Sequence, residues 1–260
     1  MPNYYVFDFD GVLFDTAREC LDIAYQAVRS HPRTQSFAQA WKDHQDPPAK
    51  VAQAFLSHRH WVGPPWQYAL LLLCIAEGQI PDSTETFLDL CARERAAFEW
   101  FTDAYFEQRW ILAKDPERWF GFTQPVQEAT QIFAQLYAQG SAWLLSTRDN
   151  QSIQRIFAHW TGTAIDEGRI LPRSGRLEKW EILLSFAQAQ KVTPARIFFL
   201  DDYLQHALPA LEHVIAAHLA TWGYLGPHDE QRARSKGLPC LRTKDLNQTV
   251  RLHDQKGEPV

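Results

Sequence analysis

The chain has 260 residues, of which 45% are hydrophobic and 22% are charged, as in a soluble globular protein with one large domain or a domain carrying an insertion. Acidic residues outnumber basic ones by 31 to 26, which argues against nucleic acid or an anionic membrane as the main partner. The four cysteines form neither a C-x-x-C pair nor a zinc-like cluster, and strand-forming residues begin at position 4, so we expect free thiols and a cytoplasmic protein without a signal peptide.

The first predicted element is a short buried strand that ends in two acids. Residues 4–7 and Phe9 favour a strand, Asp8 lies between them, and Asp10 is followed by Gly11. Successive side chains of a strand point to opposite faces, so Asp8 and Asp10 are expected on the same side. An ionised carboxylate is costly to bury without a partner, and a glycine lets another group approach the main chain closely. This stretch therefore predicts an anionic corner suited to a divalent cation.

The following segment, residues 16–122, is predicted to be helical. Thr16 and Glu19 have the spacing of a capping box at the start of a helix, and a long helix is expected from about residue 83 to Ala113, closed by Pro116. Six of the ten tryptophans lie between residues 40 and 120, where core packing is favoured over a binding pocket. Because a lone strand is not stable, we expect residues 16–122 to be an inserted domain, with residues 1–15 and 123–260 forming the core domain.

From residue 123 onward, predicted helices and strands alternate. Helices are expected at 124–139, 150–160, 178–190 and 205–212, and strands at 141–146, 196–200 and 213–219. This alternation predicts an α/β fold, a three-layer α/β/α Rossmann-like core with a parallel sheet. Ligands of such folds bind beyond the carboxyl ends of the strands, so the residues that follow each strand are the candidates for chemistry.

Polar side chains follow two of these strands. Ser146 ends the strand at 141–146 and Thr147 follows it, and a hydroxyl with backbone N–H groups at a strand-to-helix turn forms an anion site. The alternative is that this turn only caps the next helix, through Asp149 or its neighbour. Asp201 and Asp202 follow the strand at 196–200 and repeat the arrangement of the opening acids. The two acidic pairs are therefore expected to meet at one edge of the sheet.

The opening stretch Asp8-Phe9-Asp10-Gly11-Val12-Leu13-Phe14-Asp15-Thr16 resembles the first motif of the haloacid dehalogenase-like hydrolases in their phosphatase form. The resemblance implies that residues 16–122 are the helical cap of that family. It implies that Ser146, with Thr147 as the neighbouring possibility, binds a phosphoryl group. It also implies that Lys179 neutralises the phosphoryl oxygens, although Arg176 is near enough in sequence to compete for this role.

The same resemblance implies a magnesium site. Its ligands are expected to be the Asp8 carboxylate, the Asp10 main-chain carbonyl and Asp202, with Asp201, which stands in the place of the family's usual glycine, as a further metal candidate. The family usually has a third acid four or five residues later, but residues 203–206 offer none, which predicts weaker metal binding. The later stretch Trp222-Gly223-Tyr224 is similar to the phosphoglycolate phosphatase-like branch of the family.

These motifs imply a Mg²⁺-dependent phosphatase that hydrolyses a small-molecule phosphate monoester. Asp8 is expected to attack phosphorus and form an aspartyl-phosphate, while Asp10 acts as general acid and base. An acid at position 10 favours phosphoryl transfer over dehalogenation, because displacing a halide needs no proton donor. Two alternatives stay open, a phosphomutase with the same motifs and a non-enzymatic binding protein that kept the fold. The substrate and the oligomeric state are not determined by the sequence.

Overall fold

The computed structural model describes residues 2–41, 43–172 and 177–255, and it divides into two compact units. One unit combines Met1–Asp15 with Gln124–Val260 and is called the sheet unit below, and Thr16–Thr123 is the helical unit. Two short antiparallel strands, β2 (Phe14–Asp15) and β3 (Gln124–Pro125), pair at the places where the chain leaves the sheet unit and returns to it. The insertion is thus closed at its base by backbone pairing.

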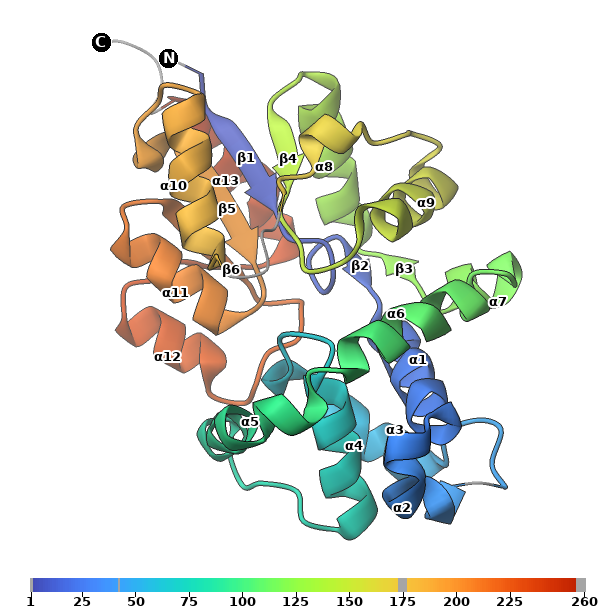
Figure 1. The fold of residues 1–260 in the computed structure, drawn as a ribbon. Coiled ribbons are helices and arrows are strands. Elements are labelled where there is room, and N and C mark those ends of the chain that lie inside the picture. Colours follow the sequence, from blue (N-terminus) through green and yellow to red (C-terminus); the bar gives the residue numbers. More distant parts are fainter. Residues whose placement is uncertain (1, 42, 173–176, 256–260) are drawn as a thin grey trace. The chain divides into compact units, whose positions relative to one another are not determined.

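The sheet unit is built on five parallel strands in the order β4-β1-β5-β6-β7. Figure 1 shows β1 between β4 and β5. The strands are β1 (Tyr4–Phe7), β4 (Ala142–Leu144), β5 (Ile197–Asp201), β6 (Ala216–Ala220) and β7 (Cys240–Leu241). All five residues of β5 are buried, as expected for a strand covered on both faces of a parallel sheet. The predicted α/β fold with a parallel sheet is confirmed.

Helices cover both faces of this sheet. They are α8 (Gln127–Ala138), α9 (Asn150–Thr161), α10 (Lys179–Ala189), α11 (Leu204–Glu212), α12 (Asp229–Ser235) and α13 (Thr243–Gln255). Val6 of β1 belongs to a buried cluster with residues of α10, α11 and α12. Its neighbours point the other way: the Phe7 ring lies 5.5 Å from Phe133 of α8, and the Tyr5 ring lies 5.7 Å from His253 of α13. The alternation along β1 therefore fixes which helices lie on which face.

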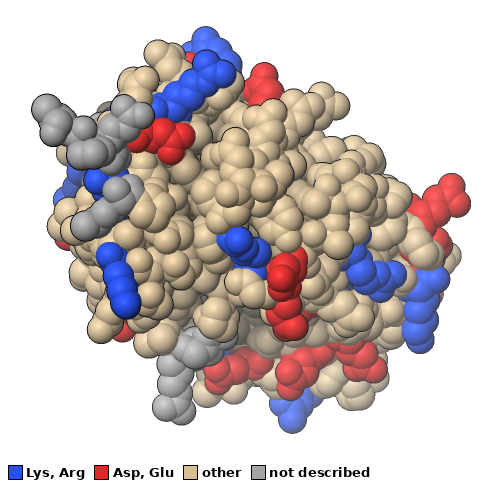
Figure 2. All heavy atoms as spheres, turned by 90° about the horizontal axis from the view of Figure 1, so that it is seen from above, with Lys and Arg blue, Asp and Glu red and all other residues tan. Residues whose placement is uncertain are grey.

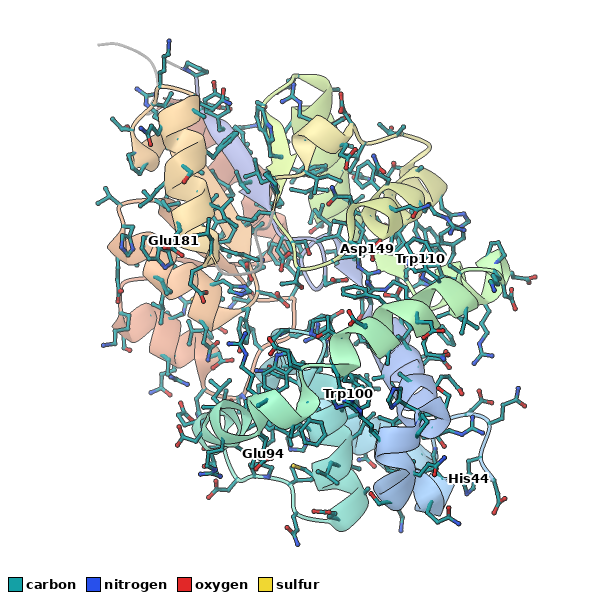
Figure 3. The ribbon with its side chains drawn as sticks, viewed as in Figure 1. His44, Glu94, Trp100, Trp110, Asp149 and Glu181 are labelled. Atoms are coloured by element: carbon teal, nitrogen blue, oxygen red, sulfur yellow. The ribbon has the colours of Figure 1, made fainter. Side chains whose placement is uncertain are left out.

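The helical unit has its own aromatic core. Its helices are α1 (Ala17–Ser30), α2 (Gln35–Ala38), α3 (Ala49–Ser57), α4 (Gln67–Glu77), α5 (Thr84–Phe98), α6 (Phe101–Leu112) and α7 (Pro116–Gly121). Trp41, Trp61, Trp66 and Trp119 are buried. Trp100 is partly exposed; it stacks on His31 at 4.0 Å, and its Nε1 donates to the Ala97 carbonyl oxygen at 2.7 Å (Figure 3). Most tryptophans of this unit are packing residues, as the sequence favoured.

The predicted capping box at the start of α1 is wrong. Thr16 is the N-cap residue, but its side chain makes no capping hydrogen bond. Glu19 is fully buried instead, where its Oε1 accepts a hydrogen bond from Trp119 Nε1 at 2.7 Å. The pattern of a capping box matched a residue whose partner comes from a helix a hundred positions later.

The long helix expected from about residue 83 to Ala113 is also corrected. It is divided into α5, which ends at Phe98, and α6, which begins at Phe101. Pro116 does not close a helix but begins α7, with Asp115 as the N-cap accepting from the backbone N–H of Arg118 at 3.1 Å. Proline suits the first helical position because the N–H it lacks has no partner there.

The four cysteines are all free thiols, as predicted. Figure 2 shows a face on which both basic and acidic side chains appear among uncharged ones. Within the described ranges, the helices are all too short or too polar to cross a membrane.

Candidate active site

Asp8, the first acid of the opening motif, lies at the carboxyl end of β1, the strand between β4 and β5. The Asp8 backbone N–H donates to the Leu200 carbonyl oxygen of β5 at 2.9 Å, which continues the ladder one residue beyond the strand. Its Oδ1 accepts from the Phe9 backbone N–H at 2.7 Å. The side chain of Asp8 is 11% exposed, so its carboxylate is placed by the sheet and largely removed from solvent.

The acids near position 200 meet Asp8 at this edge. Asp201 is the last residue of β5, Asp202 follows it, and ligand oxygens of all three buried acids lie within 4.8 Å of one another. The prediction that acids from two distant stretches come together is therefore met by these three. The Asp10 carboxylate is not a member of that group of three, and it contacts Arg148 instead.

Asp202 lies in a cradle of two glycines. A Cβ atom at Gly11 or at Gly223 would overlap the Asp202 side chain, and Gly11 has a φ of +80°, a conformation that favours glycine. Asp202 Oδ2 also accepts from the Tyr224 backbone N–H at 2.6 Å. The glycine of the opening motif thus makes room for the metal-ligand candidate itself, and the Trp222-Gly223-Tyr224 loop provides the opposite wall.

Lys179 joins the acids. It is the first residue of α10, it is 2% exposed, and its Nζ lies 3.0 Å from Asp8 Oδ2 and 2.7 Å from Asp201 Oδ2. The structure therefore places Lys179 against two of the three buried acids, and its role toward a phosphoryl group stays a prediction. The competing candidate, Arg176, lies outside the described residues.

The charges of this group act strongly on one another. Burial raises the pKa of Asp8, Lys179 opposes that rise, and the neighbouring acids Asp201 and Asp10 add to it. Burial would also raise the pKa of Asp201, but Lys179 and His206 outweigh it and hold that pKa well below its usual range. Burial works against the charge of Lys179, yet the two carboxylates raise its pKa. The site is thus an excess of buried negative charge with one ammonium in it.

Asp201 is engaged at both of its oxygens. Oδ1 accepts from the Tyr203 backbone N–H at 2.8 Å, and Oδ2 contacts His206 Nδ1 at 3.2 Å as well as Lys179. The sequence reasoning missed His206, which stands four residues after Asp202, where a third acid was sought. His206 belongs to residues 203–206, which offer no third acid, and its imidazole contacts Asp201.

Arg148 is the second residue that the sequence reasoning missed. Its Nε lies 3.0 Å and 3.2 Å from the two oxygens of Asp10, and its Nη2 donates to Asp10 Oδ1 at 2.8 Å. The Arg148 side chain is fully buried and that of Asp10 is 14% exposed. The sequence signal that could have identified Arg148 is its position. It stands two residues after Ser146, at the end of a strand whose following residues were candidates for chemistry.

The loop after β4 carries the predicted phosphoryl-binding residues. Ser146 is buried, Thr147 is half-buried, and Ser146 Oγ accepts from the Arg148 backbone N–H at 3.3 Å. Capping of α9 is performed by Asp149, whose Oδ1 accepts from the Ser152 backbone N–H at 2.8 Å (Figure 3). Capping by Asp149 is what the alternative interpretation of this turn expected, and phosphoryl binding by Ser146 and Thr147 stays a prediction.

The chain matches one family model and is similar in fold to several solved structures. Residues 3–214 match the family model of the haloacid dehalogenase-like hydrolases. Among solved structures, a protein assigned as a phosphoglycolate phosphatase from Lactobacillus delbrueckii subsp. bulgaricus is similar at 15% identity and a TM-score of 0.63, covering 95% of this chain and 98% of that one.

Two further structures are similar over nearly their whole length. One is a predicted phosphatase from Clostridium acetobutylicum, with 16% identity, a TM-score of 0.55 and complete coverage of both chains. The other is a HAD family hydrolase from Deinococcus radiodurans with bound phosphate and sodium, with 16% identity, a TM-score of 0.54 and coverage of 97% of this chain and 96% of that one. No curated protein matches the sequence. The family match spans most of the chain and includes the edge of the sheet where the acids meet, and the chain belongs to the haloacid dehalogenase-like hydrolases.

Proposed function

We propose that the protein is a Mg²⁺-dependent phosphatase that hydrolyses a small-molecule phosphate monoester through an aspartyl-phosphate on Asp8. The observation that carries the proposal is the buried meeting of Asp8 with Asp201, Asp202 and Lys179 at the carboxyl edge of the sheet. The Deinococcus radiodurans neighbour, which binds phosphate, is consistent with a phosphoryl substrate.

The first half of the reaction transfers the phosphoryl group to the enzyme. An oxygen of Asp8 attacks phosphorus and forms the new O–P bond while the bond from phosphorus to the leaving oxygen breaks. Lys179 Nζ, 3.0 Å from Asp8 Oδ2, offsets the negative charge that makes phosphate esters resist a carboxylate. Asp10 gives its proton to the leaving oxygen, and the alcohol departs.

The second half returns the enzyme to its starting state. Asp10, now ionised, takes a proton from a water molecule as the water oxygen bonds to phosphorus. The bond between phosphorus and Asp8 breaks, which releases inorganic phosphate and restores the Asp8 carboxylate. Ser146, with Thr147 as the neighbouring possibility, is assigned to hold the phosphoryl oxygens from the loop after β4, the strand next to β1.

The residues at this edge fit Mg²⁺. Asp8, Asp202 and the Asp10 main-chain carbonyl offer the oxygen donors that this ion prefers, and the buried acids exceed the single ammonium among them. Bound there, the ion supplies a Lewis acid for the phosphoryl group. Asp201, the third acid of the group, also contacts Lys179 and His206, and we assign it the role of holding these two residues in place.

The helical unit is assigned as the cap of this enzyme. It is inserted directly after the opening motif, and its base is closed by the pairing of β2 with β3. In this assignment the helical unit supplies substrate specificity, while the chemistry belongs to the sheet unit. The phosphoryl-transfer residues of the sheet unit are therefore expected to be able to act on phosphate esters of many kinds. The helical unit is expected to make most of these esters poor substrates.

A panel of phosphate esters tests the proposal. The purified chain is incubated with Mg²⁺ and glycolate, sugar, nucleotide and aryl phosphates, and released inorganic phosphate is measured beside analysis of the organic product. Phosphate release that requires Asp8 supports the phosphatase. An isomerised sugar phosphate without free phosphate identifies a phosphomutase, and saturable ligand binding with no turnover on any ester identifies a binding protein.

A further inference from the structure

Arg148 is a buried cation in the sheet unit for which the expected motifs provide no role. Its guanidinium contacts both oxygens of Asp10 through two nitrogens, at 2.8 Å to 3.2 Å. The side chain is fully buried, and a buried cation is costly unless a charged partner is close by. Asp10 is that partner, and the pair links the acid–base candidate of the opening motif to the loop after β4.

The position of the guanidinium is itself well defined. Its central carbon lies 5.6 Å from the centre of the Phe9 ring, and the Arg148 backbone N–H donates to Ser146 Oγ. β1 and β4 are neighbouring parallel strands, so the two loops that carry Asp10 and Arg148 leave the same edge of the sheet side by side. The backbone of the phosphoryl-binding loop thus places the residue that fixes Asp10.

The geometry matters for what Asp10 has to do. A general acid must present one oxygen within hydrogen-bond reach of the leaving oxygen, and a small error in position costs much of the rate. A guanidinium that contacts both carboxylate oxygens restricts the rotation of the carboxylate, which a single ammonium does not.

We propose that Arg148 is a positioning residue that fixes the Asp10 carboxylate in the orientation from which it exchanges a proton with the leaving oxygen. The inference rests on the proposed function and adds a residue to it. The inference has a specific consequence: loss of Arg148 should lower kcat/KM most for those substrates whose leaving oxygen most needs a proton. Loss of a purely structural residue would lower kcat/KM equally for all substrates.

Leaving-group dependence tests this inference. The variants Arg148→Lys and Arg148→Met are compared with the parent on an alkyl phosphate and on 4-nitrophenyl phosphate, whose leaving group departs readily without a proton. The measured quantity is kcat/KM, which reports the steps up to loss of the leaving group. We expect a fall of about 100-fold for the alkyl ester and of at most about 3-fold for the aryl ester, since positioned proton transfer contributes about 10²–10⁴. In an Asp10→Asn background, Arg148→Lys should have no further effect on the ratio.

Arg169→Lys is the matched control. Arg169 is another arginine of the sheet unit, held over the Trp143 ring at 4.2 Å and donating to the Gly140 carbonyl oxygen at 2.7 Å. Its replacement should leave the ratio of the two substrates unchanged. An equal loss for both esters in the Arg148 variants, with melting temperatures near that of the parent, overturns the positioning role. If the parent itself turns over neither ester with Mg²⁺, the proposed phosphatase function fails instead, and this is a separate result.

Discussion

Each of the two units buries acidic side chains, but they treat them differently. In the sheet unit, three acids share one lysine: Asp8, Asp201 and Asp202 lie together, and Lys179 contacts two of them. In the helical unit each of the buried acids Glu19 and Asp22 lies beside an arginine, although Arg118 also contacts the exposed Asp46. Glu19 lies 3.5 Å from Arg109 Nε, and Asp22 lies 2.8 Å from Arg118 Nη2.

We interpret the difference as one between buried charge that has an opposite charge beside it and buried charge that is in excess at the candidate site. A buried ion pair whose members are matched is roughly neutral for stability, and breaking it is costly because one charge is left without its partner. A group of like charges without enough counterions destabilises the fold, and proteins keep such groups where binding or catalysis requires them. Substitutions in the two groups should therefore have opposite consequences for activity and for stability.

The largest expected effect is on activity, from Asp8→Asn. The change removes the nucleophile, and we expect phosphate release to fall by at least about 10⁴-fold, a barrier higher by about 5.5 kcal/mol. Stability should not fall, because burial already disfavours the ionised Asp8 and Lys179 keeps Asp201 as a partner. Turnover of an aryl phosphate and the midpoint of urea unfolding are measured on the same preparation. Retained turnover would refute the nucleophile assignment.

The reverse result is expected from Glu19→Gln in the helical unit. Glutamine can still accept from Trp119 Nε1, but the buried Arg109 loses its countercharge, so the free energy of unfolding should fall by about 3 kcal/mol. Arg109 lies over the Tyr105 and Phe106 rings, which a methionine could also cover. The double variant Glu19→Gln, Arg109→Met should therefore lose less than the sum of the two single changes in urea unfolding. Simple additivity would mean that the two charges are not coupled.

The contrast also shows what the sequence could predict. Acids that follow strands were located correctly because parallel strands end at one edge, which places Asp8 beside Asp201 and Asp202 whatever the intervening chain does. Glu19 was misread because its local spacing matches a capping box, while its partners Arg109 and Trp119 are about a hundred residues away. Matched pairs between distant helices have no local signature.

The same limit applies within the site. Arg148 is a single basic residue in a bend, and His206 lies in the first turn of α11, where most such residues are solvated. The role of Arg148 depends on its contact with Asp10, which follows another strand and becomes a neighbour only when the sheet forms. His206 contacts Asp201 only five residues away, but a lone histidine at this spacing is not part of any motif that the sequence offered. Motif spacing located Lys179 because the family expectation supplied its place. A residue that is not in the motif has no such guide.

A smaller effect is expected from Mg²⁺ on stability, and it separates the two groups directly. If the ion binds the acids of the sheet unit, it should raise the free energy of unfolding by up to about 2.7 kcal/mol at a hundredfold excess over its Kd. Chelation with EDTA should remove both this gain and the phosphatase activity, and added Mg²⁺ should restore them. Thermal unfolding is measured with and without the ion. Glu19→Gln should keep the Mg²⁺ response and Asp202→Asn should lose it; a response retained in Asp202→Asn contradicts the site.

The smallest expected effect comes from Asp22→Asn, on the same helix as Glu19. Burial raises the pKa of Asp22 although Arg118 opposes it, so the ionised form weakens the fold above that raised pKa and the cost disappears as the pH falls through it. Arg118 is 36% exposed and keeps Asp46 at 3.3 Å. At pH 7 the variant should be as stable as the parent or more stable, by less than about 1 kcal/mol. The difference should vanish toward acid pH, where Asp22 is protonated and resembles asparagine.

Urea unfolding between pH 4 and pH 8 measures this difference, with Asp46→Asn as the control, because the Asp46 side chain is 77% exposed and should show little effect at any pH. Glu19 and Asp22 are both acids of α1 paired with arginines, and they differ mainly in the burial of the partner, which is 4% exposed for Arg109 and 36% for Arg118. If Asp22→Asn proved as costly as Glu19→Gln, burial of the partner would not set the value of a matched pair. The distinction between matched and excess charge would then need another physical basis. Solvation of the arginine that is left without its partner could no longer explain why one pair is replaceable and the other is not.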